Sequence, residues 1–124
     1  MRFPSFAFTA VAAVSTFAVT AEAHHSGAMY DAETIVEAEA TVAGFDWTNP
    51  HAWLQVTYAD EAGAMKEVDL ELGSPVQLVR QGWRPRTVAV GDEVTVRFHP
   101  HKDGAGTGFL VTVTLPNGET LTSE

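Results

Sequence analysis

The chain has no cysteine among its 124 residues. It therefore has no disulfide to stabilise a small domain and no thiolate to bind a metal ion. Basic residues are also few, since 7 Lys and Arg stand against 16 Asp and Glu, a net charge of −9. A surface this acidic repels nucleic acid and anionic membranes and attracts cations, so we expect no nucleic-acid partner.

The sequence also lacks the short motifs of common enzyme classes. It has no His-Glu-x-x-His, no Gly-x-Ser-x-Gly and no phosphate-binding glycine loop. The Gly-rich segment 104–108 precedes an expected strand rather than a helix, so it offers no helix N-terminus to a phosphate. We therefore expect a binding protein and not an enzyme.

A long uncharged run occurs only at the N-terminus, over residues 3–21 after Arg2. It ends at Ala21-Glu22-Ala23, where the small residues match the A-x-A pattern of a secretory signal. A transmembrane anchor is the alternative, but polar residues break the run and no basic stop-transfer cluster follows. We expect cleavage after Ala23, or otherwise after Ala21, and a periplasmic or secreted mature protein with no membrane span.

The remaining chain is long enough for one small domain with a single core. Residues 24–33 show no periodicity and are expected to form an extended arm, and residues 34–124 are expected to form the domain. Alternating apolar and polar residues predict five strands and a short sixth. The inward residues are Val36, Ala38, Ala40 and Val42; Ala52, Leu54, Val56 and Tyr58; Val68, Leu70 and Leu72; Val94, Val96 and Phe98; and Phe109, Val111, Val113 and Leu115, with the sixth strand at 119–121. The acidic outward residues Glu37, Glu39, Glu67, Asp69 and Glu71 are expected to be solvated.

One short helix is predicted between the third and fourth strands. Ser74 is suited to the N-cap, Pro75 to the first helical position and Gly82 to the C-terminal stop. Val76 and Val79 are expected to mark its apolar face, together with Leu78 and Trp83. The order of three strands, one helix and two strands predicts an all-β, OB-like five-stranded barrel (oligonucleotide/oligosaccharide-binding architecture), with a small β-sandwich as the alternative.

In this architecture the loops joining strands 1–2 and 4–5 flank the ligand face. The first of these loops carries Trp47 and His51, and the second is expected to carry His99 and His101. His24 and His25 lie in the arm. We therefore expect a metal site drawn from His24, His25, His51, His99 and His101, with His51 as the first partner for the arm.

The donor types favour copper, because imidazole nitrogen is a common ligand of Cu(II) and Zn(II) and copper binds such sites tightly. Cleavage after Ala23 would place an α-amine and an imidazole on His24. Cleavage after Ala21 would place His24 third in the chain, where an amine, two backbone amides and an imidazole can hold Cu(II) or Ni(II). The sequence also leaves open that these histidines are solvated surface groups or loop caps.

The alternative function is a non-metal module of the cell envelope that binds a glycan, a small molecule or a protein partner. Trp47 and Trp53 would supply its aromatic surface, although they could equally pack the end of the barrel. The first hypothesis remains a protein that transports, delivers or stores copper.

Several segments together carry a family resemblance: Ala-His-His-Ser at 23–26, Trp-Thr-Asn-Pro-His-Ala-Trp at 47–53, Gly-Ser-Pro at 73–75 with Gly82-Trp83, Gly-Asp-Glu-Val at 91–94 and Pro-x-x-Asp-Gly at 100–104. The chain resembles an uncharacterised family of small secreted bacterial proteins, a domain of unknown function, over essentially the whole mature segment. The resemblance implies secretion and a single domain, and no particular activity. It makes His25 and His51 more typical of the family than His99 and His101.

Overall fold

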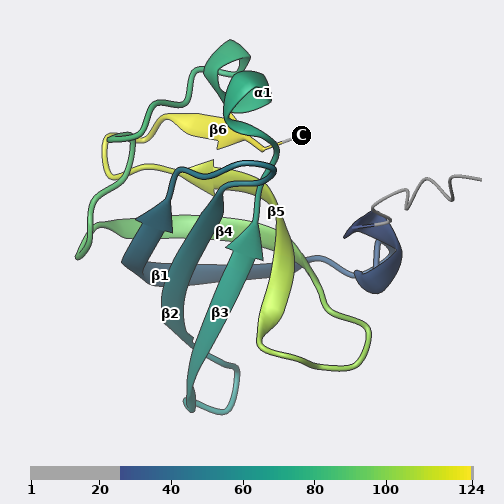
Figure 1. Cartoon of the computed structure of the whole chain (residues 1–124). Helices are drawn as coiled ribbons and strands as arrows, with labels where there is room; N and C mark the ends of the chain where they lie inside the picture. Colours follow the sequence, from purple (N-terminus) through teal and green to yellow (C-terminus); the bar gives the residue numbers. More distant parts are fainter. Residues whose placement is uncertain (1–25, 124) are drawn as a thin grey trace, which may run out of the picture.

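The computed structural model describes residues 26–123 (Figure 1). Its elements follow the predicted order of three strands, a helix and two strands, with a short sixth strand after them. They are η1 (Ser26–Met29), β1 (Val36–Asp46), β2 (Trp53–Ala59), β3 (Met65–Glu71), α1 (Pro75–Arg80), β4 (Glu93–Pro100), β5 (Thr107–Thr114) and β6 (Thr120–Thr122). No helix in the described part of the chain is long and apolar enough to cross a membrane.

The sheet closes into a barrel of five strands. Its order is β3-β2-β1-β4-β5-β6, and a further parallel pairing joins β3 to β5. That pairing sets Leu70 opposite Gly108 and Glu71 opposite Phe109. Closure removes the free edges that an open sheet of this length would expose. The strand order, with α1 between β3 and β4, confirms the OB-like barrel.

Strand β1 is long enough to serve both sides of the barrel. Its first half pairs with β4, from Val36 opposite Phe98 to Thr41 opposite Glu93, and its second half pairs with β2. The register with β2 shifts between Val42 and Gly44, so one extra residue bulges out of β1. A bulge bends a strand and changes which residues face inward, and after it Phe45 packs against the core.

The core confirms most of the predicted alternation. Leu54, Leu70 and Val96 are fully buried, while outward neighbours such as Glu37 and Glu67 are exposed. The exception is β5, where the sequence predicts Phe109 and Val111 inward but the structure buries Leu110 instead. The register between β4 and β5 shifts beside Phe98, which leaves Val111 as an extra residue in β5. That bulge reverses the inward phase within the strand, so the prediction is wrong at Phe109 and Val111 and right at Val113 and Leu115.

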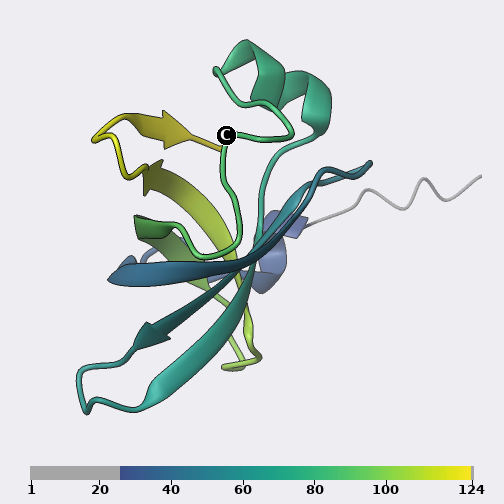
Figure 2. The same cartoon turned by 90° about the vertical axis from the view of Figure 1, so that its left-hand side faces the viewer.

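Helix α1 begins as the sequence predicts. Ser74 is the N-cap, its side chain accepts a hydrogen bond from the backbone N–H of Gln77, and the Gln77 side chain completes a capping box. The predicted apolar face is wrong in part, because Leu78 is buried but Val76 and Val79 are 61% and 42% exposed. Six residues form fewer than two turns, so only one side of α1 can contact the barrel end on which it stands (Figure 2).

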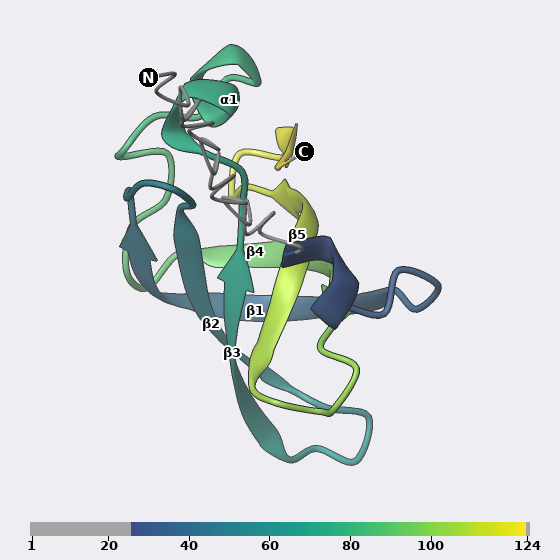
Figure 3. The same cartoon turned by 45° about the vertical axis from the view of Figure 1, so that its right-hand side comes forward.

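The arm is not extended where the structure describes it. Residues 26–29 form the 3-10 helix η1, which lies outside the barrel next to β5 (Figure 3). Tyr30 then makes an isolated antiparallel bridge with His101 and is only 3% exposed. Two backbone hydrogen bonds flank the bridge, from Asp31 N to Pro100 O at 2.8 Å and from Lys102 N to Met29 O at 2.9 Å. The sequence does not predict this contact, because a single buried tyrosine produces no periodic pattern.

Candidate functional site

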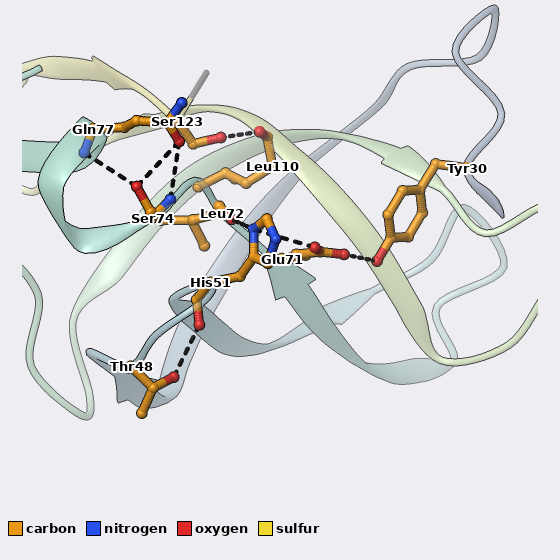
Figure 4. A network of polar contacts seen from close by, with 9 residues as sticks. All are labelled: Tyr30, Thr48, His51, Glu71, Leu72, Ser74, Gln77, Leu110 and Ser123. Carbon is orange, nitrogen blue, oxygen red and sulfur yellow. Dashed lines mark hydrogen bonds and ion pairs between the residues drawn. The ribbon is translucent and has the colours of Figure 1, made fainter. Parts of the chain in front are cut away.

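A buried carboxylate organises the outer face of the barrel at the end of β3. Glu71 is 4% exposed, and its Oε2 accepts a hydrogen bond of 2.5 Å from the Tyr30 hydroxyl (Figure 4). Its Oε1 lies 3.4 Å from Nδ1 of His51. Burying a carboxylate is costly unless donors satisfy it, so these two partners account for its place in the fold.

The prediction that Glu71 is solvated is therefore wrong, while Glu37, Glu39, Glu67 and Asp69 are exposed as expected. Glu71 does face outward, but Trp53 of β2 and Phe109 of β5 are its lateral neighbours. Tyr30 covers it from a position 41 residues earlier in the chain. One feature of the sequence could have indicated this burial: Glu71 is the last residue of its strand and directly precedes Leu72, which is buried.

Among residues 26–123, the His51 ring has polar partners at Nδ1 and none at Nε2. Nδ1 lies 3.0 Å from the carbonyl oxygen of Leu72 as well as 3.4 Å from Glu71. Since both partners are acceptors, Nδ1 carries a hydrogen, and in the neutral form of the ring the lone pair is on Nε2. The loop is tied down by Thr48, whose hydroxyl donates to the His51 carbonyl at 2.9 Å. The side chain is 29% exposed, so solvent or a ligand can reach the ring.

The Tyr30 ring fills the space between the N-terminal segment and the barrel wall. Its centroid lies 5.8 Å from that of Phe109 and 5.9 Å from that of His101, the latter in an edge-on arrangement. Burial raises the pKa of the Tyr30 hydroxyl well above its usual range, and the hydrogen bond to Glu71 raises it further. The hydroxyl therefore stays a donor to Glu71 throughout the neutral range.

The two other predicted ligands that the structure describes, His99 and His101, have polar partners different from those of His51. His24 and His25 are outside the described residues. His99 belongs to β4 rather than to the loop predicted from the sequence, and its Nδ1 lies 2.8 Å from the carbonyl oxygen of Thr34. The Nδ1 of His101 contacts the carboxylate of Asp103. Within residues 26–123, no three His, Asp or Glu side chains are grouped in a way that could hold a metal ion.

The two predicted aromatic residues have different surroundings. Trp53 is half-buried in β2, directly opposite Glu71. Trp47 is half-buried after β1, with its ring centroid 5.9 Å from that of Phe45, and it faces α1. An open groove of about 310 Å³ lies there, lined by Trp47, Pro75, Val76, Val79 and Arg80.

A second recess of about 380 Å³ lies where β1 and β4 meet the end of β5. Glu39, Glu93 and threonine side chains line it, and it contains no histidine or tryptophan. None of the predicted site residues within 26–123 lines it. The candidate site is therefore the His51–Glu71–Tyr30 network, with the Trp47 groove as a separate surface feature.

Fold and network together define a small OB-like barrel protein whose N-terminal segment is fastened to its outer face by a buried polar network. The chain belongs to a family of unknown function (DUF6152), whose family model matches residues 11–111. No curated protein and no solved structure matches the chain significantly. The predicted membership of an uncharacterised family is thus confirmed, and the family assigns no activity.

Proposed function

We propose that the protein is a small periplasmic metal-binding protein that handles copper in transport, delivery or storage. The observation that carries the proposal is the orientation of His51. Metal-binding histidines almost always donate their second ring N–H to a carbonyl or carboxylate, which fixes the ring and raises the basicity of the ligating nitrogen. His51 has both kinds of acceptor at Nδ1, and Nε2 is left to bind an ion.

The anchoring of the arm supports a second ligand from the N-terminus. Tyr30 is bound to the same carboxylate that orients His51. His25 precedes Tyr30 by five residues, and a chain spans at most about 3.3–3.6 Å per residue, so five residues of chain reach at most about 18 Å from that anchor. An arm free along its whole length would search a far larger volume, so fastening it at Tyr30 favours a site shared with His51.

The donor set favours copper over harder ions. Imidazoles and an α-amine are nitrogen donors that suit Cu(II), and the absence of cysteine removes the thiolates typical of structural zinc sites. The net charge of −9 raises the local concentration of any cation. His99 and His101 remain candidate ligands, because Nδ1 of each also has a polar partner, the carbonyl of Thr34 and the carboxylate of Asp103. His51 differs from both in sharing the Glu71 carboxylate with the Tyr30 hydroxyl.

The test begins with the processed protein isolated from the periplasm, whose N-terminus is determined by mass spectrometry. Titration with Cu(II), followed by calorimetry and by electron paramagnetic resonance, should give one ion per chain bound through nitrogen ligands. His51→Ala and His24→Ala should each weaken binding by at least about tenfold. Asn49→Ser, an exposed position in the same loop as His51, is the matched control and should bind as the wild type.

A copper stoichiometry near zero contradicts the proposal, as does an affinity that neither histidine substitution changes. The mass spectrum also separates the two cleavage sites. A chain starting at His24 should lose affinity when its α-amine is acetylated and should need His51. A chain starting at Glu22 should hold Cu(II) in a square plane, bind Ni(II) as well, and depend on His51 far less.

A further inference from the structure

We propose that the groove between α1 and the loop after β1 is a binding site for a small organic anion with an apolar body, a hydrophobic carboxylate. The groove has a volume of about 310 Å³, at the lower end of the range for small-molecule sites. This site is separate from the His51 network and involves no metal. It therefore stands or falls independently of the copper proposal.

The groove is apolar although it is open to water. Trp47 forms one wall, and Pro75, Val76 and Val79 of α1 form the other. Val76 and Val79 are 61% and 42% exposed. An exposed helical position is best filled by alanine or by a long polar residue, because valine loses side-chain freedom in a helix and gains nothing by facing water. Local stability thus does not explain these two valines, whereas an apolar ligand does.

One end of the groove is cationic. Arg80 lines it directly, and Arg84 folds back so that its guanidinium donates to the carbonyl of Val79 at 3.1 Å. Arg86 follows two residues later and is exposed. Three of the 7 basic residues of the chain thus fall in one short segment.

In the described part of the chain, these arginines have no acidic partner. Among the described residues, no ion pair involves Arg80, Arg84 or Arg86, whereas Arg97 pairs with Glu37 at 3.3 Å. Arg84 donates to the carbonyls of Val79 and Trp83, so Arg80 is the arginine that lines the groove with its charge available to a ligand. An arginine presents a planar donor fork that matches a carboxylate, so Arg80 can bind the head of such a ligand while the valines contact its body.

The charge of the whole protein favours a small ligand over an anionic lipid surface. A net charge of −9 opposes close approach to an anionic bilayer, which the rest of the surface would also face. A small anion meets only the local field of the arginine end.

The experiment uses the processed protein in the presence of a chelator and follows the indole N–H resonance of Trp47 by NMR, assigned with Trp47→Phe. Sodium octanoate is the probe, octanamide is its uncharged counterpart and butanoate has a shorter body. Octanoate should shift the resonance to saturation, and the other two should bind at least about fivefold more weakly, because each has lost the charge or the apolar contact.

The variants test the two halves of the site separately. Val76→Thr with Val79→Thr keeps the shape of both side chains and should weaken octanoate binding at least about fivefold. Arg80→Gln should weaken octanoate but leave octanamide unchanged. Val90→Thr, at a valine 74% exposed elsewhere, and Arg97→Gln are the matched controls and should bind octanoate as the wild type.

Three results would overturn the proposal. The first is no saturable shift with octanoate, and the second is equal weakening by the groove and control variants. The third is binding to phosphatidylglycerol vesicles that depends on Val76 and Val79 while octanoate fails to bind, which would assign the groove to a lipid surface. Loss of copper binding would contradict the copper proposal alone, because this titration contains no free metal.

Discussion

Tyr30→Phe removes a single oxygen atom from the centre of the network and keeps the ring that packs against Phe109. The hydroxyl donates to Glu71 at 2.5 Å, and the tyrosine is 3% exposed. The substitution therefore leaves the Glu71 carboxylate buried with only the weaker contact to His51, 3.4 Å away. It tests whether the network fastens the N-terminal segment.

The expected cost follows from the type of bond. A hydrogen bond to a charged group contributes about 1.5–3 kcal/mol, and a buried carboxylate left short of a donor adds part of its desolvation cost. We expect the free energy of unfolding to fall by about 2–3 kcal/mol. For a domain of this size about 1 kcal/mol corresponds to about 4–8 °C, so the melting temperature should fall by about 10–20 °C.

Chemical denaturation at pH 7 measures the change, with Tyr58→Phe as the matched control. No hydrogen bond of the described residues involves the Tyr58 hydroxyl, and its ring likewise contacts a phenylalanine, Phe98. That variant should stay within about 0.5 kcal/mol of the wild type. Glu71→Gln and the double variant complete a double-mutant cycle. Its coupling energy measures the interaction between Tyr30 and Glu71 separately from the other effects of each substitution.

The raised pKa of Tyr30 gives a second readout with a definite sign. Above pH 10, the usual tyrosine pKa, the unfolded chain releases the Tyr30 proton while the folded chain retains it. The contribution of Tyr30 is thus complete below pH 10 and is lost as the pH rises above it. Burial also raises the pKa of Tyr58, with the charge of Asp60 adding to the effect, so the comparison is made in a Tyr58→Phe background. There the stability gap caused by Tyr30→Phe should narrow as the pH passes 10.

The reasoning is refuted if Tyr30→Phe and Tyr58→Phe are equally stable at pH 7. A coupling energy near zero between Tyr30 and Glu71 would be equally damaging, because the hydroxyl would then contribute nothing specific to the carboxylate. If the difference in unfolding free energy caused by Tyr30→Phe stayed constant through pH 10, the raised pKa of Tyr30 would be contradicted. The contribution of its hydrogen bond to Glu71 at pH 7 would not be.

Two further substitutions test the fold. Gly108→Ala should lower the free energy of unfolding by about 1–3 kcal/mol, because its new Cβ would lie 2.7 Å from the Phe98 ring. Gly106→Ala, where the nearest atom would lie 3.6 Å away, is its control and should differ little from the wild type in denaturation. Ser74→Ala should cost about 1 kcal/mol through loss of the N-cap, and Ser74→Thr should recover most of it in the same assay.

The strands and the helix were predictable because their signals are local. The alternation around Leu54 and Leu70 has the period of a strand with one face in the core, and both residues are fully buried. Ser74 and Pro75 mark a helix start by chemistry that needs no knowledge of the rest of the fold. The order of these elements then limited the closed arrangements to very few.

The failures occur where the local periodicity of the sequence carries no information. Glu71 has the sequence signature of a solvated strand residue, and only the packing of β5 and Tyr30 over it makes it buried. Phe109 was predicted inward because a single bulged residue, Val111, leaves no mark in the pattern. Val79 was assigned to the wrong face because a helix of six residues is too short for its period to identify the buried side.

The network also determines how the proposed metal site would respond to changes that touch no ligand. Tyr30 and His51 share the Glu71 carboxylate, so the conformation that fastens the arm is also the one that orients the His51 ring. An ion bound by His51 and an arm histidine would favour that conformation, and by linkage the fastened arm must favour the ion to the same extent. Tyr30→Phe should therefore weaken metal binding at the shared site even though it alters neither ligand. It should leave the affinity unchanged if the N-terminus chelates the ion alone, which makes the tyrosine a better discriminator of the two geometries than either histidine.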